Sequence, residues 1–224
     1  KSLVDIYRRV LSHPSVKNAF IGSGIRHDML SDLDNEDRLS HRAYLEQLIG
    51  HHVSGRLKVA PEHTADDVLK LMRKPPFQIF KDFKQSFEQI CQEKGLNHQL
   101  VPYFISSHPG CALEDMAQLA LETKNLGYRL QQAQDLTPTP MTLSAVLYYT
   151  GYNPYTRKNV YTAKSNQEKQ SQRKFIYWYK KENSGWIRDR LKEMGQGDKV
   201  KQLFSGTQSD SVKKWNKHTR QKKE

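Results

Sequence analysis

Apolar residues recur along the first 140 residues in two alternating patterns, and each pattern predicts a different element. Short apolar runs that end in turn residues predict strands at 16–21, 56–60, 98–106 and 128–135. Apolar residues at spacings of three and four predict helices at 3–11, 40–49, 64–74, 77–90 and 113–126. Strands and helices alternate at intervals of about 30 to 40 residues, which is typical of parallel βαβ crossovers. The pattern therefore predicts an α/β fold.

The stretch 55–74 places a candidate site within this pattern. A short buried strand is followed by the turn Pro61-Glu62-His63 and by a helix that begins at Thr64. Thr64 is predicted to cap that helix together with Asp67, which has the spacing of a capping box. Residues just past the carboxyl end of a parallel strand line the ligand crevice of α/β proteins. Glu62 and His63 are therefore expected at a site of binding or chemistry.

The character of the sequence changes after residue 140. Lys1 to Thr156 contains 17 Lys and Arg against 17 Asp and Glu, whereas Arg157 to Glu224 contains 19 against 7. The whole net charge of +12 therefore lies in the last third. Helices are predicted at 142–150, 167–181, 186–194 and 199–204. We expect residues 1–140 to form one unit, 141–204 a basic helical appendage, and 205–224 a disordered basic tail.

Composition excludes several classes of protein. The chain has no apolar run of about 18 residues and no leader with a small-residue cleavage site, so neither a membrane span nor a signal peptide is predicted. A cytoplasmic location is expected. Its two cysteines, Cys91 and Cys111, are too few for a disulfide scaffold and are interpreted as inert core thiols. The chain starts at Lys1 inside a helical pattern, which suggests that the amino-terminal half of the same fold lies upstream.

Three ordered motifs resemble the later strands of radical S-adenosylmethionine (SAM) enzymes. APEHTADDVLKLMRK (60–74) is similar to the fourth-strand segment, LVPYFISSHPGCALEDM (100–116) to the fifth, and LQQAQDLTPTPMT (130–142) to the sixth. Four shorter segments resemble the YgiQ family of radical SAM proteins more closely: FIGSGIRHD, GRLKVAPEHT, PYFISSHPG and LYYTGYNP. The resemblance covers about residues 16–181 and is specific only in combination.

The resemblance implies the later βα units of a partial (β/α)6 TIM-like barrel. It also implies a [4Fe-4S] cluster, whose electron cleaves SAM to methionine and a 5'-deoxyadenosyl radical that acts on an unknown substrate. The family holds its cluster with a C-x-x-x-C-x-x-C run, which this sequence lacks, and Cys91 and Cys111 cannot replace it. The family's glycine-rich segment is also missing. Either the cluster ligands lie upstream of Lys1, which we favour, or the chain is a degenerate relative that has lost them; in both cases this chain alone is predicted to be inactive.

Five positions correspond to places where the family holds SAM. Glu62 stands where a polar residue contacts the ribose region, and Lys74 where a basic residue meets the SAM carboxylate. Ser23 and Arg26 follow the first strand, in the place from which the family holds the ribose or the amino-acid end. Tyr103 falls where relatives often have aspartate. An ordinary structural interpretation remains open for each: Arg26 and Lys74 as solvated charges, Glu62 as a turn cap, and Ser23 as part of a tight turn.

A second class of function is RNA or tRNA binding by the basic aromatic region. Five aromatic residues lie among its lysines and could stack on bases while the lysines meet phosphates: Tyr177, Trp178, Tyr179, Trp186 and Trp215. The alternative is that Trp178 and its neighbours pack the appendage onto the barrel.

A third class is an aldolase that uses Lys58 as a Schiff-base nucleophile. Lys58 alternates with Leu57 and Val59, so an outward orientation explains it equally well. A metal site is not predicted, because His51, His52 and His63 have no recognisable ligand spacing and scattered histidines are usually solvated.

Overall fold

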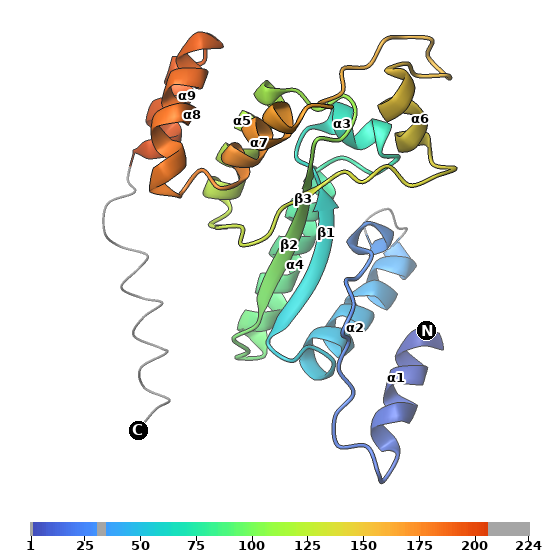
Figure 1. The fold of residues 1–224 in the computed structure, drawn as a ribbon. Coiled ribbons are helices and arrows are strands. Elements are labelled where there is room, and N and C mark those ends of the chain that lie inside the picture. Colours follow the sequence, from blue (N-terminus) through green and yellow to red (C-terminus); the bar gives the residue numbers. More distant parts are fainter. Residues whose placement is uncertain (1, 31–34, 206–224) are drawn as a thin grey trace.

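A parallel sheet of three strands forms the centre of the computed structural model, which describes residues 2–30 and 35–205 (Figure 1). Its strands are β1 (Arg56–Glu62), β2 (Gln99–Ser106) and β3 (Gln134–Asp135), in the order β1-β2-β3. Both pairs are parallel. The predicted parallel α/β arrangement is confirmed for these strands, while closure into a larger barrel stays a prediction.

Helices connect and surround the strands in the predicted order. The elements before β1 are α1 (Ser2–Ser12), the 3-10 helix η1 (His27–Leu30) and α2 (Asn35–His51). The crossovers contain α3 (Asp66–Leu71) and α4 (Gln78–Glu93) between β1 and β2, and α5 (Leu113–Asn125) between β2 and β3. The chain continues with α6 (Leu143–Thr150), α7 (Asn166–Ile176), α8 (Lys181–Glu193) and α9 (Gly197–Phe204). In Figure 1, α4 lies behind the sheet, and α3, α5, α6 and α7 lie at the end to which the strands point.

Alternate residues of the strands form one core with α4. Leu57 and Val59 of β1 are buried on the same face as Leu100 and Phe104 of β2. The buried stripe of α4, with apolar residues at spacings of three and four, is Phe80, Phe83, Phe87 and Ile90. Burying each such side chain contributes about 1.5 to 3 kcal/mol, so this stripe holds the crossover on the sheet. The same core continues into the appendage through Phe175, Ile176, Trp178, Ile187, Leu191 and Leu203.

Two predicted strands are wrong in whole or in part. Residues 16–21 are irregular and form no strand. Four residues further on, Ile25 forms an isolated parallel bridge to Val59 of β1. Phe20 is 52% exposed in this segment, so its side chains lack the two-sided burial of an inner strand. The predicted strand 128–135 shortens to Gln134–Asp135, which pairs with the last two residues of β2.

Two helix predictions also change at their ends. The cap of α3 is Ala65 rather than Thr64, because β1 continues to Glu62 and moves the helix start forward. The Thr64 hydroxyl is buried and makes no hydrogen bond to a described group. The predicted helix 167–181 ends at Ile176, and a turn before α8 lets Trp178 enter the core with 4% of its surface exposed.

An extra residue interrupts the pairing of β1 with β2. Val59 lies opposite Pro102, but the next partners are Glu62 and Phe104, so β1 uses three steps where β2 uses two. Such a bulge bends a strand and redirects its side chains, and bulges are frequent beside functional sites. It lies at the carboxyl end of β1, where the sequence predicts the site.

Among residues 2–30 and 35–205, no helix has the length and apolar character needed to cross a membrane. The predicted disordered tail lies, apart from Ser205, outside the described residues.

Candidate functional site at the carboxyl ends of the strands

The backbone is strained where β1 and β2 end. Glu62 has φ of 68° and Ser107 has φ of 62°, the left-handed region that residues with a Cβ rarely adopt. Each such residue costs about 1 to 3 kcal/mol and persists only where its surroundings fix it. Two of them at neighbouring strand ends show that the backbone is constrained at this edge of the sheet.

Glu62 and Lys74 meet at this edge, as the sequence predicts. Lys74 Nζ lies 3.4 Å from Glu62 Oε1, and the two side chains are 29% and 18% exposed. Glu62 comes from the bulged end of β1, and Lys74 from the turn that separates α3 from α4. The pair is a partly shielded cation beside a carboxylate, a combination that can hold a zwitterion or a hydroxyl-rich ligand.

A small crevice beside this pair brings a third segment to the site. Its volume is about 10 Å³, about the space of one water molecule. It is lined by residues of three segments: His27 and Asp28, Ala60 and Pro61, and Lys74, Pro75, Pro76, Phe77 and Phe80. The segment after the predicted first strand therefore reaches the turn that carries Lys74.

Arg26 is held beside the crevice by a bidentate ion pair. Its Nε and Nη2 atoms donate to the two carboxylate oxygens of Asp28, at 2.8 and 2.5 Å. The hydrogen bond from Arg26 lowers the pKa of Asp28. His27 packs edge-on against Phe80, and burial, with a smaller effect of Lys74, lowers its pKa. The predicted cation Arg26 is thus already paired with a carboxylate, whereas Asp28 itself lines the crevice.

The other two predicted residues lie apart from the pair. Ser23 is exposed in a bend of the same loop as Arg26. Tyr103 is half-buried on β2 and lines a separate open groove of about 320 Å³. The remaining lining residues of that groove are Gln131, Gln132, Ala133, Gln134 and Tyr177. Of the five predicted positions, Lys74 lines the crevice, Glu62 pairs with Lys74, and Arg26 pairs with the lining residue Asp28, whereas Tyr103 belongs to another surface.

A buried polar network, which the sequence reasoning missed, underlies the strained strand ends. His63 is fully buried, so its interpretation as a solvated histidine is wrong. Its Nδ1 accepts the backbone N–H of Ala65 at 3.0 Å, which leaves the ring proton on Nε2, 3.3 Å from Cys111 Sγ. The amide of Gln172 on α7 completes the network: Oε1 accepts the Ser107 N–H at 2.7 Å, and Nε2 donates to the Cys111 carbonyl at 2.8 Å.

The protonation of this network does not favour nucleophilic chemistry. Burial raises the pKa of the Cys111 thiol, and burial lowers the pKa of His63 to about 3. A neutral thiol beside a neutral imidazole is an inert pair, because the thiolate is the reactive form. The only signal in the sequence was the polar run Ser106-Ser107-His108 at a strand end. The network therefore positions the backbone, and Cys111 behaves as the core thiol that was predicted.

The described residues do not fit an iron-sulfur cluster. Both cysteines are buried, Cys91 on α4 and Cys111 before α5. In the described part of the chain, no group of three or more His, Cys, Asp and Glu side chains could hold a metal ion. A cluster would therefore need ligands other than those described here.

The aromatic residues proposed for RNA stacking are largely covered by other side chains. Trp178 is buried, and the Trp186 ring lies 4.4 Å from Lys174 Nζ and 5.4 Å from the Arg190 guanidinium carbon. The Tyr179 hydroxyl donates to the Leu130 carbonyl at 2.6 Å. These contacts match packing of the appendage against the sheet; Trp215 lies outside the described residues.

Comparison with known proteins identifies one matching domain family and several similar proteins. Residues 131–217 match a family described as a domain of unknown function, DUF3362. A UPF0313 protein of Porphyromonas gingivalis is 52% identical over 213 residues, which are 93% of this chain and 33% of that protein. UPF0313 proteins of Bacteroides thetaiotaomicron and Methanocella arvoryzae are 49% and 40% identical, over 90% and 88% of this chain and 33% and 32% of their own lengths.

The chain therefore spans about a third of the length of the curated relatives that it matches. UPF0313 is the YgiQ-like family, which agrees with the finer of the two resemblances drawn from the motifs. The names of these relatives state no reaction, substrate or cofactor.

Proposed function

We propose that this chain supplies part of the SAM-binding edge of a radical SAM enzyme whose cluster ligands lie in other residues. The observation that carries the proposal is the convergence of Glu62 and Lys74, 3.4 Å apart, at the carboxyl end of a parallel strand. This is the place where α/β proteins bind ligands. The bulge and the left-handed backbone at Glu62 support a site that is built for more than packing.

The chemistry of the residues suits the two ends of SAM. Lys74 would meet the carboxylate of the amino-acid end, and Glu62 would accept hydrogen bonds from ribose hydroxyls. Ser23 and Arg26 lie on the loop that reaches the same crevice and would support the amino-acid end or the ribose. The crevice is too small for a nucleoside, so SAM would lie across its open side. A bound cluster would supply the electron for SAM cleavage; the chain alone is expected to form no 5'-deoxyadenosine.

Equilibrium dialysis of the 224-residue chain with two ligands tests the assignment. SAM carries the carboxylate, and 5'-methylthioadenosine has the same nucleoside without the amino-acid end. Lys74→Ala should weaken SAM binding by about 10-fold or more, since a hydrogen bond to a charged group contributes about 1.5 to 3 kcal/mol. The same variant should leave 5'-methylthioadenosine binding unchanged, whereas Glu62→Gln should weaken both ligands.

Lys70→Ala is the matched control, because Lys70 is an exposed lysine of α3 that pairs with Asp67. It should leave the affinity for both ligands as it is. Equal losses for both ligands in Lys74→Ala, or no loss for either, would contradict the proposed role of Lys74.

A further inference from the structure

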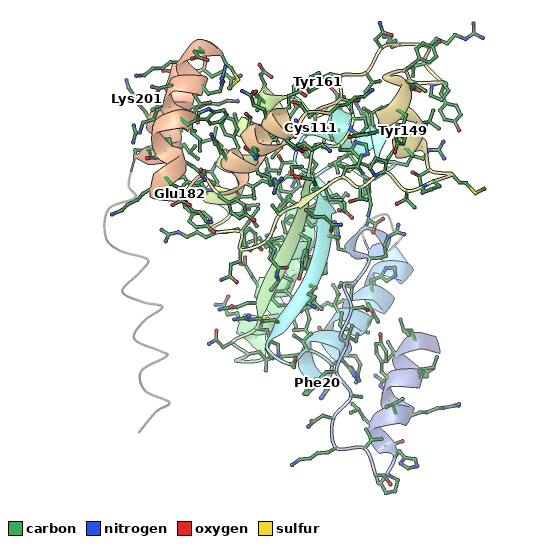
Figure 2. The ribbon with its side chains drawn as sticks, viewed as in Figure 1. Phe20, Cys111, Tyr149, Tyr161, Glu182 and Lys201 are labelled. Atoms are coloured by element: carbon green, nitrogen blue, oxygen red, sulfur yellow. The ribbon has the colours of Figure 1, made fainter. Side chains whose placement is uncertain are left out.

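The chain segment that follows β3 carries exposed tyrosines, and none of them belongs to the site described above. Tyr149 at the end of α6 and Tyr155 in the next turn are 71% and 72% exposed, and Tyr152 is 39% exposed. Arg157 and Lys158 follow on the same turn and are exposed. These five residues are called the tyrosine surface below. Figure 2 shows Tyr149 at the same end of the molecule as Cys111, and Phe20 near the other end.

The backbone beneath the tyrosine surface is held in one shape. Tyr152 and Asn159 form an antiparallel bridge, and the Asn153 side chain is buried. Asn153 Oδ1 accepts the backbone N–H groups of Tyr155 and Thr156, at 2.9 and 3.2 Å. A ligand therefore meets a preformed turn, and tyrosine rings lose little conformational freedom when they are covered.

The charged residues of the segment that carries these rings have a single sign. Residues 141–165 contain three Lys and Arg and no Asp or Glu. Neither Arg157 nor Lys158 forms an ion pair with any residue that the structure describes. The Arg73 guanidinium lies 5.2 Å from the centre of the Tyr155 ring, so the tyrosine surface borders the turn that carries Lys74.

We propose that the tyrosine surface binds single-stranded nucleic acid. Exposed aromatic rings stack on bases of any sequence, and neighbouring cations meet the phosphates. Protein partners also use tyrosine, yet a segment that carries Arg157 and Lys158 and no carboxylate of its own favours a polyanion. The inference does not rest on the proposed function, because none of the five residues is assigned to SAM.

Fluorescence anisotropy of the 224-residue chain with a labelled single-stranded RNA of about 12 nucleotides tests the proposal, without SAM or cluster. Tyr149→Ala and Tyr155→Ala should each raise the Kd by about 5-fold to 150-fold, which is the range for loss of one stacked base. Arg157→Gln combined with Lys158→Gln should reduce the slope of log affinity against log salt concentration by about 1.4, or about 0.7 for each lost phosphate contact.

Two control variants test whether RNA binding depends on the tyrosine surface or on exposed aromatic and basic residues anywhere on the chain. Phe20→Ala removes an exposed aromatic ring that Figure 2 places far from Tyr149, and Lys201→Gln removes an exposed cation of α9. Neither should change the Kd by more than about twofold, within the usual effect of a surface substitution. The proposal is overturned if the chain does not bind the RNA, if the tyrosine variants bind like the unchanged chain, or if Lys201→Gln reduces the salt slope as much as the double variant.

Discussion

At the scale of single residues, the imidazole of His63 is fully enclosed by the fold. It lies between the Ala65 N–H and the Cys111 thiol with none of its surface exposed. The sequence could not reveal this, because its partner Cys111 is 48 positions away and no ligand spacing connects the two. Burial of the ring favours its neutral form, and this couples the stability of the fold to pH.

The pH dependence has a definite sign. The pKa of His63 is lowered to about 3 in the folded chain, from 6.5, so between these values only the unfolded chain holds this proton. The contribution of neutral His63 to the free energy of unfolding is therefore complete above pH 6.5. It decreases as the pH drops toward 3, by about 1.4 kcal/mol per pH unit. Urea unfolding at pH 7, 6 and 5 should show a shallower fall in the free energy of unfolding for His63→Gln than for the unchanged chain. Exposed His51→Gln should retain the full fall, and equal slopes in all three would refute this account.

At the scale of elements, the turn between β2 and α5 joins three parts of the chain. Gly110 in this turn has φ of 86°, and its N–H donates to the Tyr161 carbonyl at 2.7 Å. A Cβ on Gly110 would collide with Leu71 Cδ1 at the end of α3. The close approach holds α3 and the segment 151–161 against the end of β2, next to the strained Ser107.

Alanine substitutions at two glycines separate collision from backbone strain. Gly127 has φ of 77° and open space around the position of its missing Cβ, so Gly127→Ala should cost about 1 to 2 kcal/mol from the left-handed backbone alone. Gly110→Ala should cost about 1 to 3 kcal/mol more, because the Leu71 side chain, the turn or α3 must shift to make room for the Cβ. Denaturant unfolding gives both values. Equal losses at the two glycines would show that Leu71 yields freely and that the contact is unimportant.

At the scale of the whole molecule, α7 belongs to the core of the sheet. Its Gln172 is 1% exposed and bonds to backbone groups on both sides of the turn after β2. Arg173 on the same helix pairs with Asp135 of β3 at 2.9 Å. The basic region therefore contributes polar contacts that fix the carboxyl ends of the strands, in addition to its buried apolar residues.

Removal of the Gln172 amide should be costly. Gln172→Leu leaves the Ser107 N–H and the Cys111 carbonyl buried without partners, so the free energy of unfolding should fall by about 2 to 4 kcal/mol. Gln170→Leu changes the same residue type at an exposed position of α7 and should stay within about 0.5 kcal/mol. Urea denaturation of both variants provides the comparison. A small loss for Gln172→Leu would mean that Ser107 keeps its conformation without α7.

The sequence predicted the parts of this fold that depend on local patterns. The elements β1, β2, α4 and α5 follow from runs and spacings, and the meeting of Glu62 with Lys74 follows from the strand-turn-helix order. Segments 16–21 and 128–135 have strand-like composition, but strand formation depends on a neighbour, and most of their length has none among the described residues. The network around Cys111 was missed because it joins residues from three distant segments, which no local pattern records.

The contact between Lys74 and Glu62 also limits which anions this edge could accept. Its cation already has a carboxylate 3.4 Å away, supplied by the chain itself at a fixed position. A small free anion such as acetate offers nothing that the internal partner lacks, so it should compete poorly. Only a molecule that gains further contacts along the neighbouring loop and strand end would displace the Glu62 carboxylate from Lys74. The ion pair therefore favours binding of larger ligands over small anions.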